Sequence, residues 1–351
     1  MKKFLKINNI KIGDLYPPVF FPDIGTFFNK NIKIAKKMTN ELINSGAQII
    51  KGEILHNPNI ALNINSYEKY LGKKNKIIKE KIRDVIERKV VSLNNYEKIY
   101  SICKNKKIPF VLSVYDYEGA NFAKDIGAGA LKIASSNLTH RPLIEHICKL
   151  DVPIILDTGR SSYSEIKKSL SWFKIKKFNR IHIQHSPYPP PHGLKKHDLL
   201  MLKSLKKDFN LTVGLSDHHS SDEMLYAAVA LGANSIEKGI VPNLIKEDQD
   251  VGHALSINEF RTVNEKCINI FKALGNKRRF LKPNSPRHNY RMCIVSSKKI
   301  EKNEKLTEEN LTYAFPIKGI EAEFQKKILG KTLRKTVKKF TPIKWKNLNV
   351  N

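Results

Sequence analysis

Eight short apolar segments, each followed by a longer segment with helical periodicity, constrain the fold of this sequence more than any other feature. The apolar segments have the length and β-branched content of buried strands, and they lie at residues 19–27, 47–55, 108–115, 130–136, 152–159, 180–186, 211–218 and 234–241. The helical segments include NIKIAKKMTNELINSGA and DEMLYAAVALGA, and several end in glycine, as helices often do. Eight successive strand–helix units predict a (β/α)8 TIM barrel, whereas an open doubly wound sheet seldom contains so many parallel strands in a row.

The C-terminal part of the chain has a different character. After the eighth unit, the segment GNKRRFLKPNSPRHNYR is rich in proline, asparagine and arginine, as linkers are. Short β-like runs separated by turn residues follow over about 60 residues, a length at which a domain is only marginally stable alone. We therefore predict an α/β barrel domain at 15–277, a linker at 278–290 and a small β-rich domain at 291–351.

The formal net charge of +30 raises nucleic acid or an anionic membrane as a partner. The lysines, however, are spread along the whole chain among asparagine and isoleucine, as in LGKKNKIIKEKIRDVIERK, and do not form one basic stretch. This dispersion favours a solvated basic surface over a nucleic-acid interface. A positive field also attracts small anionic substrates.

The cysteines and the apolar segments indicate in which cellular compartment the protein is expected. The four cysteines stand far apart without a C-x-x-C pair, so they suggest neither a disulfide framework nor a zinc site; they are Cys103, Cys148, Cys267 and Cys293. No segment offers about 18 uninterrupted apolar residues, and Lys6, Asn8 and Asn9 interrupt any signal-peptide core. We expect a cytoplasmic protein with no membrane partner.

Polar residues gather at the carboxyl ends of the predicted strands, where a barrel builds its active site. They include Asp23, Lys51, Glu53, Ser113, Lys132, Ser135, Asp157, Ser186, Ser216, His218 and Glu237. Lys51 and Lys132 each lie in an apolar run, where an unpaired lysine would be costly, so we expect them to bind a phosphate or carboxylate. His218 is a candidate metal ligand, general base or hydrogen-bonded cap.

Four segments, in the same order, resemble the sialic acid synthase (N-acetylneuraminate synthase) family. They are GALKIASSNLTHRPLIEHICKLDVPIILDTG, QHSPYPPP, VGLSDHHSSDEMLYAAVALGANSIEKG and the C-terminal IVSSKKIEKNEKLTEENL with GKTL. The resemblance covers essentially the whole chain and implies a barrel followed by an antifreeze-like (SAF) domain. It also implies condensation of phosphoenolpyruvate with an open-chain N-acyl amino sugar, giving phosphate and a nine-carbon 2-keto sugar acid, with Mn²⁺ or Mg²⁺ polarising the aldehyde oxygen.

The resemblance further implies roles for individual residues. The catalytic group would be Asp23, Lys51, Lys132 and Glu237, with the two lysines on phosphoenolpyruvate and Glu237 beside the metal. Substrate contacts would come from Glu53, Ser135, Ser186, Tyr188, Ser216 and Asp250, and His218 would be the first metal ligand. Such enzymes are domain-swapped homodimers in which the small domain lends an arginine to the partner's site. Arg291 is the candidate here, with Arg287 as the alternative.

Several positions depart from the family pattern. Asp23 is one methylene shorter than the family's glutamate, and Glu53 places an extra negative charge where the family has glutamine. Val114 lacks the hydroxyl of the family's threonine. Asn137 stands where the family has an acidic residue. Each change falls where the substrates would bind.

The segment SIEKGIVPN carries the departure that most concerns the metal. Glu237 and Gly239 are two residues apart and share a face of the predicted strand, and the family has its second metal-binding histidine at 239. We expect room for an imidazole there. The metal would be weakly held by His218, Glu237 and water, or by a site rebuilt with His219 or His253.

Three functions are consistent with these residues. The first is an active but divergent synthase, favoured because the phosphate-binding set is retained. The second is a relative with altered or lost chemistry that binds a sugar acid. The third is a polyanion-binding protein, supported only by the net charge.

Overall fold

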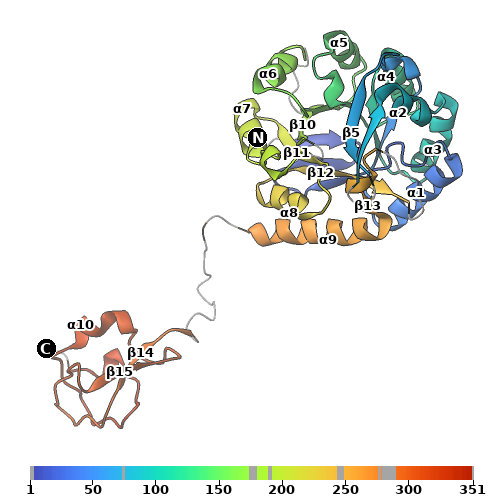
Figure 1. Ribbon diagram of the computed structural model, residues 1–351. Helices are drawn as coiled ribbons and strands as arrows, with labels where there is room; N and C mark the ends of the chain where they lie inside the picture. Colours follow the sequence, from blue (N-terminus) through green and yellow to red (C-terminus); the bar gives the residue numbers. More distant parts are fainter. Residues whose placement is uncertain are drawn as a thin grey trace. The chain divides into compact units, whose positions relative to one another are not determined.

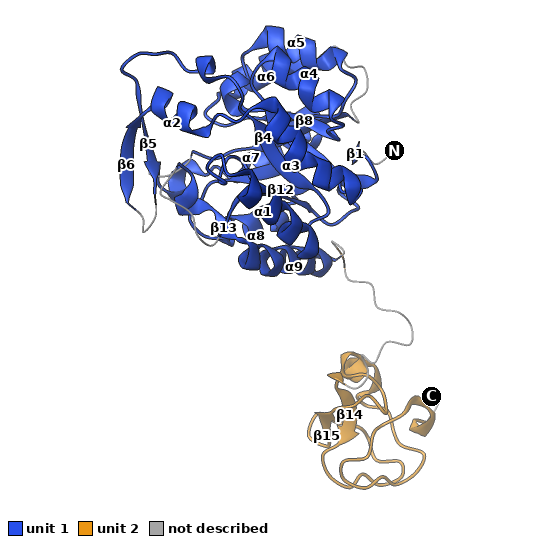
Figure 2. Cartoon of the chain, turned by 90° about the vertical axis from the view of Figure 1, so that its right-hand side faces the viewer, with its two compact units in different colours: residues 1–275 blue, residues 276–351 orange. Residues whose placement is uncertain are grey.

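The computed structural model describes residues 4–72, 76–173, 180–188, 192–242, 249–275, 278 and 290–349. The chain divides into two compact units, residues 1–275 and 276–351 (Figure 1, Figure 2). The predicted linker at 278–290 lies outside the described residues, except for its two end positions.

The first unit is a closed barrel of eight parallel strands, which confirms the predicted fold class. The strands are β3 (Val19–Asp23), β4 (Ile50–Ile54), β7 (Phe110–Val114), β8 (Ala130–Ile133), β9 (Ile154–Asp157), β10 (Ile181–His185), β11 (Thr212–Asp217) and β12 (Ser235–Val241). Each pairs in parallel with the next, and the pairing of β12 with β3 closes the barrel. All eight predicted segments contain one of these strands. A short strand, β13 (Leu255–Ser256), extends the sheet beside β12.

Helices surround the barrel, as Figure 1 shows. They are α1 (Ile32–Asn44), α3 (Leu93–Asn105), α4 (Tyr117–Asp125), α5 (Arg141–Lys149), α6 (Tyr163–Ser171), α7 (Met201–Phe209), α8 (Glu223–Ala230) and α9 (Ile257–Leu274). Helices α6 and α9 begin with capping boxes, in which a serine and a glutamate three residues later satisfy two free backbone N–H groups. In the part of the chain that the structure describes, no helix is both long and apolar enough to span a bilayer.

The main core lies between the strands and the helices. Strand residues such as Ile133 and Leu156 are fully buried there against helix residues such as Ile144 and Phe260. Removing this apolar surface from water is the principal force that holds the helices on the barrel. The strand side chains that point the other way are therefore free to build the interior of the barrel.

An N-terminal hairpin, β1 (Phe4–Ile7) and β2 (Ile10–Gly13), packs at the opposite end from the polar residues. Its Leu5 and Ile12 share a separate buried cluster with Val19, Val111 and Ile155 of the barrel strands. This apolar plug covers the amino ends of the strands.

A second hairpin interrupts the strand–helix alternation after β4 and was not predicted. It consists of β5 (Tyr67–Leu71) and β6 (Ile77–Lys81) and leads into α2 (Ile82–Lys89). Figure 2 shows this insertion projecting at one side of the barrel. Its backbone also reaches the loop after β12, because a Cβ on Gly252 would lie only 2.6 Å from the carbonyl oxygens of Leu71 and Gly72.

The second unit is small and has its own core. Its elements are β14 (Cys293–Ser296), β15 (Leu311–Ala314) and a single-turn helix, α10 (Gln325–Ile328). Ile294, Ile300, Leu333 and Ile343 are buried at its centre, and β14 pairs antiparallel with β15. The predicted small β-rich domain is confirmed.

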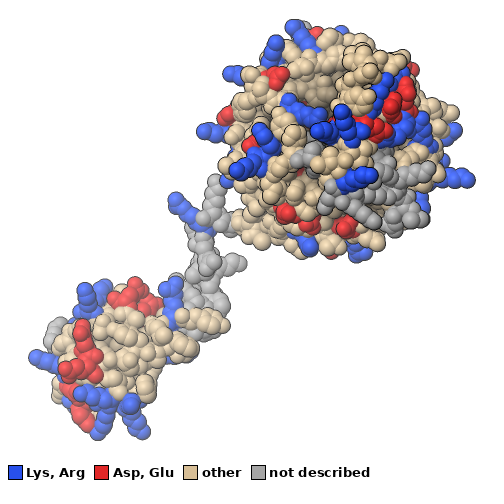
Figure 3. Space-filling model, in the orientation of Figure 1, with Lys and Arg blue, Asp and Glu red and all other residues tan. Residues whose placement is uncertain are grey.

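Lysine and arginine side chains are dispersed over the surface. Figure 3 shows them across the visible face of both units, with aspartate and glutamate between them. This agrees with the dispersion expected from the sequence. All four cysteines are free.

Candidate active site

A cavity of about 570 Å³ lies at the carboxyl ends of the barrel strands. Ten predicted site residues line it: Asp23, Lys51, Glu53, Lys132, Ser135, Ser186, Ser216, His218, Glu237 and Asp250. Tyr188 is not among the lining residues; it is 38% exposed, and its ring contacts His192 instead. Arg291 belongs to the second unit, where it is exposed, and Arg287 lies outside the described residues.

Lys132 is held inside the cavity by two carboxylates and a hydroxyl. Its Nζ lies 2.5 Å from Glu237 Oε1 and 2.9 Å from Asp157 Oδ2, and donates to Ser216 Oγ at 3.2 Å. The lysine is only 3% exposed. Its charge is therefore compensated by groups from three other strands, β9, β11 and β12.

Lys51 is held in a similar way. Its Nζ lies 2.5 Å from Asp23 Oδ2 and 3.7 Å from Glu237 Oε1. Burial alone would lower the pKa of Lys51, but Asp23 and Glu237 more than offset it, so the pKa is raised and the ammonium group stays charged. Glu237 thus lies between the two lysines.

The pKa values of the two carboxylates beside Lys51, Glu237 and Asp23, are shifted in opposite directions. Burial raises the pKa of Glu237, but Lys132 and Lys51 lower it more, so the net pKa is depressed and Glu237 is ionised. For Asp23 burial is the larger influence, and its pKa is raised despite Lys51. Asp23 is therefore the member of this group that binds a proton most readily.

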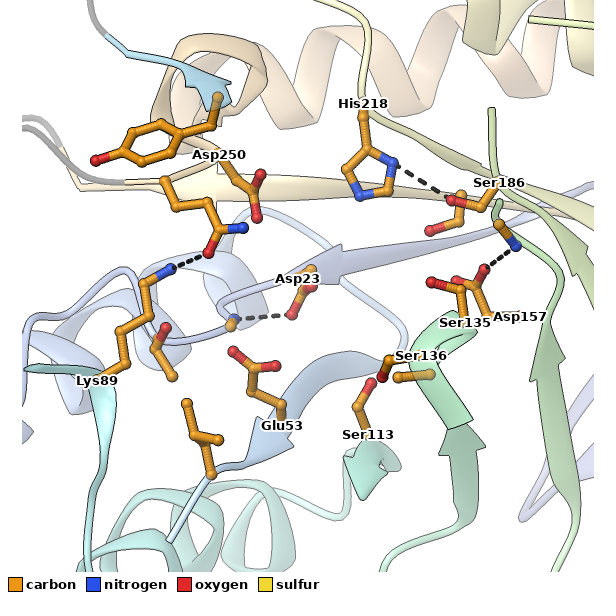
Figure 4. A pocket seen from close by; sticks show the side chains of 18 of the residues that line it. Asp23, Glu53, Lys89, Ser113, Ser135, Ser136, Asp157, Ser186, His218 and Asp250 are labelled. Carbon is orange, nitrogen blue, oxygen red and sulfur yellow. Dashed lines mark hydrogen bonds between the residues drawn. The ribbon is translucent and has the colours of Figure 1, made fainter. Parts of the chain in front are cut away.

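His218 directly follows β11 and points toward Ser186 in Figure 4. Its Nδ1 is 3.5 Å from Ser186 Oγ, and its ring lies 5.0 Å, centroid to centroid, from that of His253. Burial, together with His253, lowers the pKa of His218 to about 4, so the imidazole is neutral near pH 7. Asp250 binds His253 Nε2 at 3.1 Å, while His253 Nδ1 has no hydrogen-bond partner among the described residues.

The expected space beside Gly239 is filled. A Cβ built on Gly239 would lie 2.9 Å from Phe27 Cζ and 3.4 Å from Ala254 Cβ, which leaves no room for an imidazole. The prediction of an open position at 239 is therefore wrong. Phe27 comes from the loop after β3, and pairing between strands does not reveal where such a loop side chain will point.

Lys238 faces away from the cavity and holds the loop that carries His218. Its Nζ lies 2.5 Å from Asp217 Oδ2 and donates to the carbonyl oxygens of His219 and Ser221. The side chains of Lys238 and Asp217 are completely buried. Because adjacent strand residues point to opposite faces, Glu237 enters the cavity while Lys238 fixes the loop behind it.

Family comparison connects this cavity with known proteins. The family model described as NeuB family matches residues 38–279, and that of the SAF domain matches residues 291–349. The chain belongs to the NeuB family.

The relatives that match most of this chain include two named synthases and an uncharacterised protein. An N,N'-diacetyllegionaminic acid synthase of Campylobacter jejuni is 27% identical over 320 residues, covering 90% of this chain and 96% of the relative. A pseudaminic acid synthase of Helicobacter pylori is 24% identical, covering 94% and 97%. An uncharacterised protein of Methanocaldococcus jannaschii is 30% identical, covering 97% and 99%.

The N-acetylneuraminic acid synthetase of Leptospira borgpetersenii, solved with citrate, has the same fold. It superposes with a TM-score of 0.69 at 24% identity, covering 81% of this chain and 94% of that one.

The departures from the family pattern in this NeuB-family chain differ in their placement. Glu53 lines the cavity, and the Tyr115 hydroxyl donates to its Oε2 at 2.6 Å. Val114 is completely buried. Asn137 donates to the carbonyl of Val114 at 3.4 Å and is not among the residues that line the cavity. Only Glu53 of these three can therefore contact a substrate in this arrangement.

Other cavity residues came from segments in which sequence reasoning named no site. Lys89, labelled in Figure 4, donates to Gln249 Oε1 at 3.3 Å. Gln249 donates in turn to Glu68 Oε2 at 3.1 Å. Arg160 pairs with Glu68 at 3.3 Å. These contacts join the β5–β6 hairpin to the loops after β9 and β12. The signal that could have drawn attention to Lys89 is its place at the end of an amphipathic helix, with one face buried.

Within the described residues, no group of three or more histidine, cysteine, aspartate and glutamate side chains could hold a metal ion. Residue 239 is glycine and supplies no ligand beside His218. Two neighbouring imidazoles are nonetheless present at His218 and His253, and the second has a buried nitrogen without a partner among the described residues. Two imidazoles are fewer protein ligands than a tightly bound metal has, so a divalent ion here would take most of its ligands from water or substrate.

Proposed function

We propose that this protein condenses phosphoenolpyruvate with the aldehyde of an open-chain N-acyl amino sugar, with water adding at C2 of phosphoenolpyruvate, so that phosphate leaves and a nine-carbon 2-keto sugar acid forms. The observation that carries this proposal is the pair of buried lysines in a cavity at the carboxyl ends of a barrel. Membership of the NeuB family and the names of its legionaminic and pseudaminic acid synthases support the class of reaction.

Lys51 and Lys132 would bind the phosphate and carboxylate of phosphoenolpyruvate. Both ammonium groups are fixed by ion pairs, so little side-chain freedom is lost when an anion arrives. Ser135 and Ser186 line the same side of the cavity and would donate hydrogen bonds (Figure 4). Ser216, which donates to Glu237 Oε1 at 3.1 Å, would keep that carboxylate in place.

The amino sugar would occupy the other side of the cavity. Glu53 would accept a hydrogen bond there from an N–H or O–H group of the sugar. Asp250 would accept a hydrogen bond from a sugar hydroxyl. Tyr188, which does not line the cavity, would contact the sugar from outside it. Asp23 holds a proton more readily than an ordinary aspartate and would donate it to the aldehyde oxygen as the carbon–carbon bond forms.

Mn²⁺ or Mg²⁺ would be held by His218 and His253, with Glu237 on the adjacent strand. When bound, such an ion polarises the aldehyde oxygen. Burial keeps His218 neutral, the form that binds metals. Asp250 fixes the orientation of the His253 ring through Nε2.

An assay of phosphate release tests the proposed reaction. Phosphoenolpyruvate is offered with hexoses carrying one or two acylamino groups, with and without Mn²⁺. Release that requires both the sugar and Lys132 supports the proposal. Binding of phosphoenolpyruvate without release with any sugar supports a second candidate, a sugar-acid-binding relative with lost chemistry, which the filled space beside Gly239 favours.

We also propose a domain-swapped homodimer in the cytoplasm, where free cysteines persist. Arg291 of one chain would complete the cavity of the other. Mixing Arg291→Ala chains with Lys132→Met chains should then restore activity through dimers that contain one intact site. A barrel cut after Gly275 that turns over as fast as the whole chain would exclude this arrangement.

A further inference from the structure

Asp157 occupies a position unlike that of the other cavity carboxylates. It ends β9 and is 5% exposed, and both of its oxygens are engaged: Oδ2 lies 2.9 Å from Lys132 Nζ, and Oδ1 accepts the N–H of Gly159 at 3.0 Å.

The surroundings of Asp157 consist of hydrogen-bond donors. Figure 4 places Ser135, Asp157 and Ser186 together at one side of the cavity. They are closely packed, since a Cβ on Gly159 would lie 3.1 Å from the Cβ atoms of both serines. The ammonium group of Lys132 and the two serine hydroxyls are donors of the kind that a bound phosphate uses, whereas the N–H of Gly159 is taken by Asp157. A carboxylate of the chain itself already lies among them.

The carboxylates around Lys51 and Lys132 also oppose the binding of a further anion. Lys132 contacts Asp157 and Glu237, and Lys51 contacts Asp23 and Glu237, so each lysine has two carboxylate partners before any anion binds. Other groups that face Asp157 include His218 and His185, whose pKa values burial lowers, so that they are neutral near pH 7. An incoming anion therefore meets lysines that are already neutralised.

We propose that Asp157 is an internal anion that competes for Lys132 and sets how tightly the cavity binds a phosphate or carboxylate. The inference rests on the proposed anion-binding role of the lysine pair. When the external anion binds, Asp157 leaves Lys132 and retains Gly159 as its partner. The carboxylate thereby limits occupancy by simple anions such as inorganic phosphate and favours ligands that gain further contacts elsewhere in the cavity.

The test is calorimetric titration of phosphoenolpyruvate and of inorganic phosphate into the full-length chain. Asp157→Asn keeps the shape and the acceptor for Gly159 but removes the charge, and Asp157→Ser serves as a second variant if the first folds poorly. Both should bind inorganic phosphate about tenfold or more tightly than the wild type, since a charge-assisted contact is released. The matched control is Glu68→Gln, which removes a charge from the cavity wall without touching either lysine and should change the affinity less than about twofold.

Equal or weaker phosphate binding by a folded Asp157 variant overturns the inference, as does an equal gain in Glu68→Gln. If the proposed function is wrong, a different measurement shows it. If Lys132→Met binds phosphoenolpyruvate as tightly as the wild type, the lysine assignment itself is wrong, whatever Asp157 does.

Discussion

The ring of Phe27 takes the space that a side chain on Gly239 would need, with Phe27 Cζ only 2.9 Å from the position of the added Cβ. Gly239→His alone should therefore destabilise the barrel without improving metal binding. The double variant Phe27→Ala/Gly239→His should bind Mn²⁺ about tenfold or more tightly than the wild type, because it opens space for a further imidazole beside His218 and His253. Calorimetric titration with Mn²⁺ measures this directly. Phe27→Ala alone, the control, should leave the Mn²⁺ affinity unchanged; a gain in that variant would mean that the ring, not the missing imidazole, limits binding.

Replacement of Lys132 by methionine should abolish phosphoenolpyruvate binding and also destabilise the fold. The substitution leaves Asp157 and Glu237 buried without their main counter-charge, which costs about 3 kcal/mol or more in the free energy of unfolding. Urea denaturation and calorimetry measure the two effects. The exposed Lys203→Met should change neither. Retained phosphoenolpyruvate affinity in Lys132→Met would contradict the assignment.

Lys238→Met should lower the free energy of unfolding by about 3–5 kcal/mol, because Asp217 would be left fully buried without its counter-charge, with the N–H of His219 still donating to it. The double variant Lys238→Met/Asp217→Leu should recover much of that loss, since the uncompensated charge is gone. Denaturation curves of the two variants decide the point. If the double variant is no more stable than the single one, the hydrogen bonds to the loop, and not the charge, are what Lys238 provides.

The stability of the protein should depend on His218 at mildly acidic pH. Burial, with His253, lowers the pKa of His218 to about 4 from its ordinary 6.5, so the folded state resists protonation. The contribution to stability is present above pH 6.5 and is lost as the pH falls toward 4, with a slope of up to about 1.4 kcal/mol per pH unit. Denaturation of the wild type and His218→Gln across this range should show the steeper loss in the wild type. Parallel curves would mean that the imidazole is solvated in the folded protein.

The sequence predicted the barrel and most of the cavity wall for a simple reason. The carboxyl ends of parallel strands meet at one end of a barrel, so residues such as Lys51, Lys132 and Glu237 converge once the strands are placed. The pattern of apolar and helical segments was therefore sufficient to predict which residues line the cavity from the strand ends. The family resemblance then supplied Asp250, which lies on a loop.

The contacts that the sequence did not predict are long-range ones made by loops. Phe27 reaches Gly239 across the strand pair that closes the barrel, and Lys89 reaches Gln249 from an inserted hairpin. Tyr188 follows β10 as predicted, yet it does not line the cavity. Side-chain direction in a loop depends on packing against distant segments, which periodicity does not encode.

The pairing of β3 with β12 joins Val19 to Ser235 and closes the barrel between its first and last strands. During synthesis, β3 must therefore keep an unpaired edge until almost the whole first unit has left the ribosome. Contacts this distant in sequence form slowly, and an open strand edge is a template for association with other chains. The nascent chain is thus most exposed to aggregation just before β12 emerges, and truncation ahead of that strand leaves the exposed edge permanent.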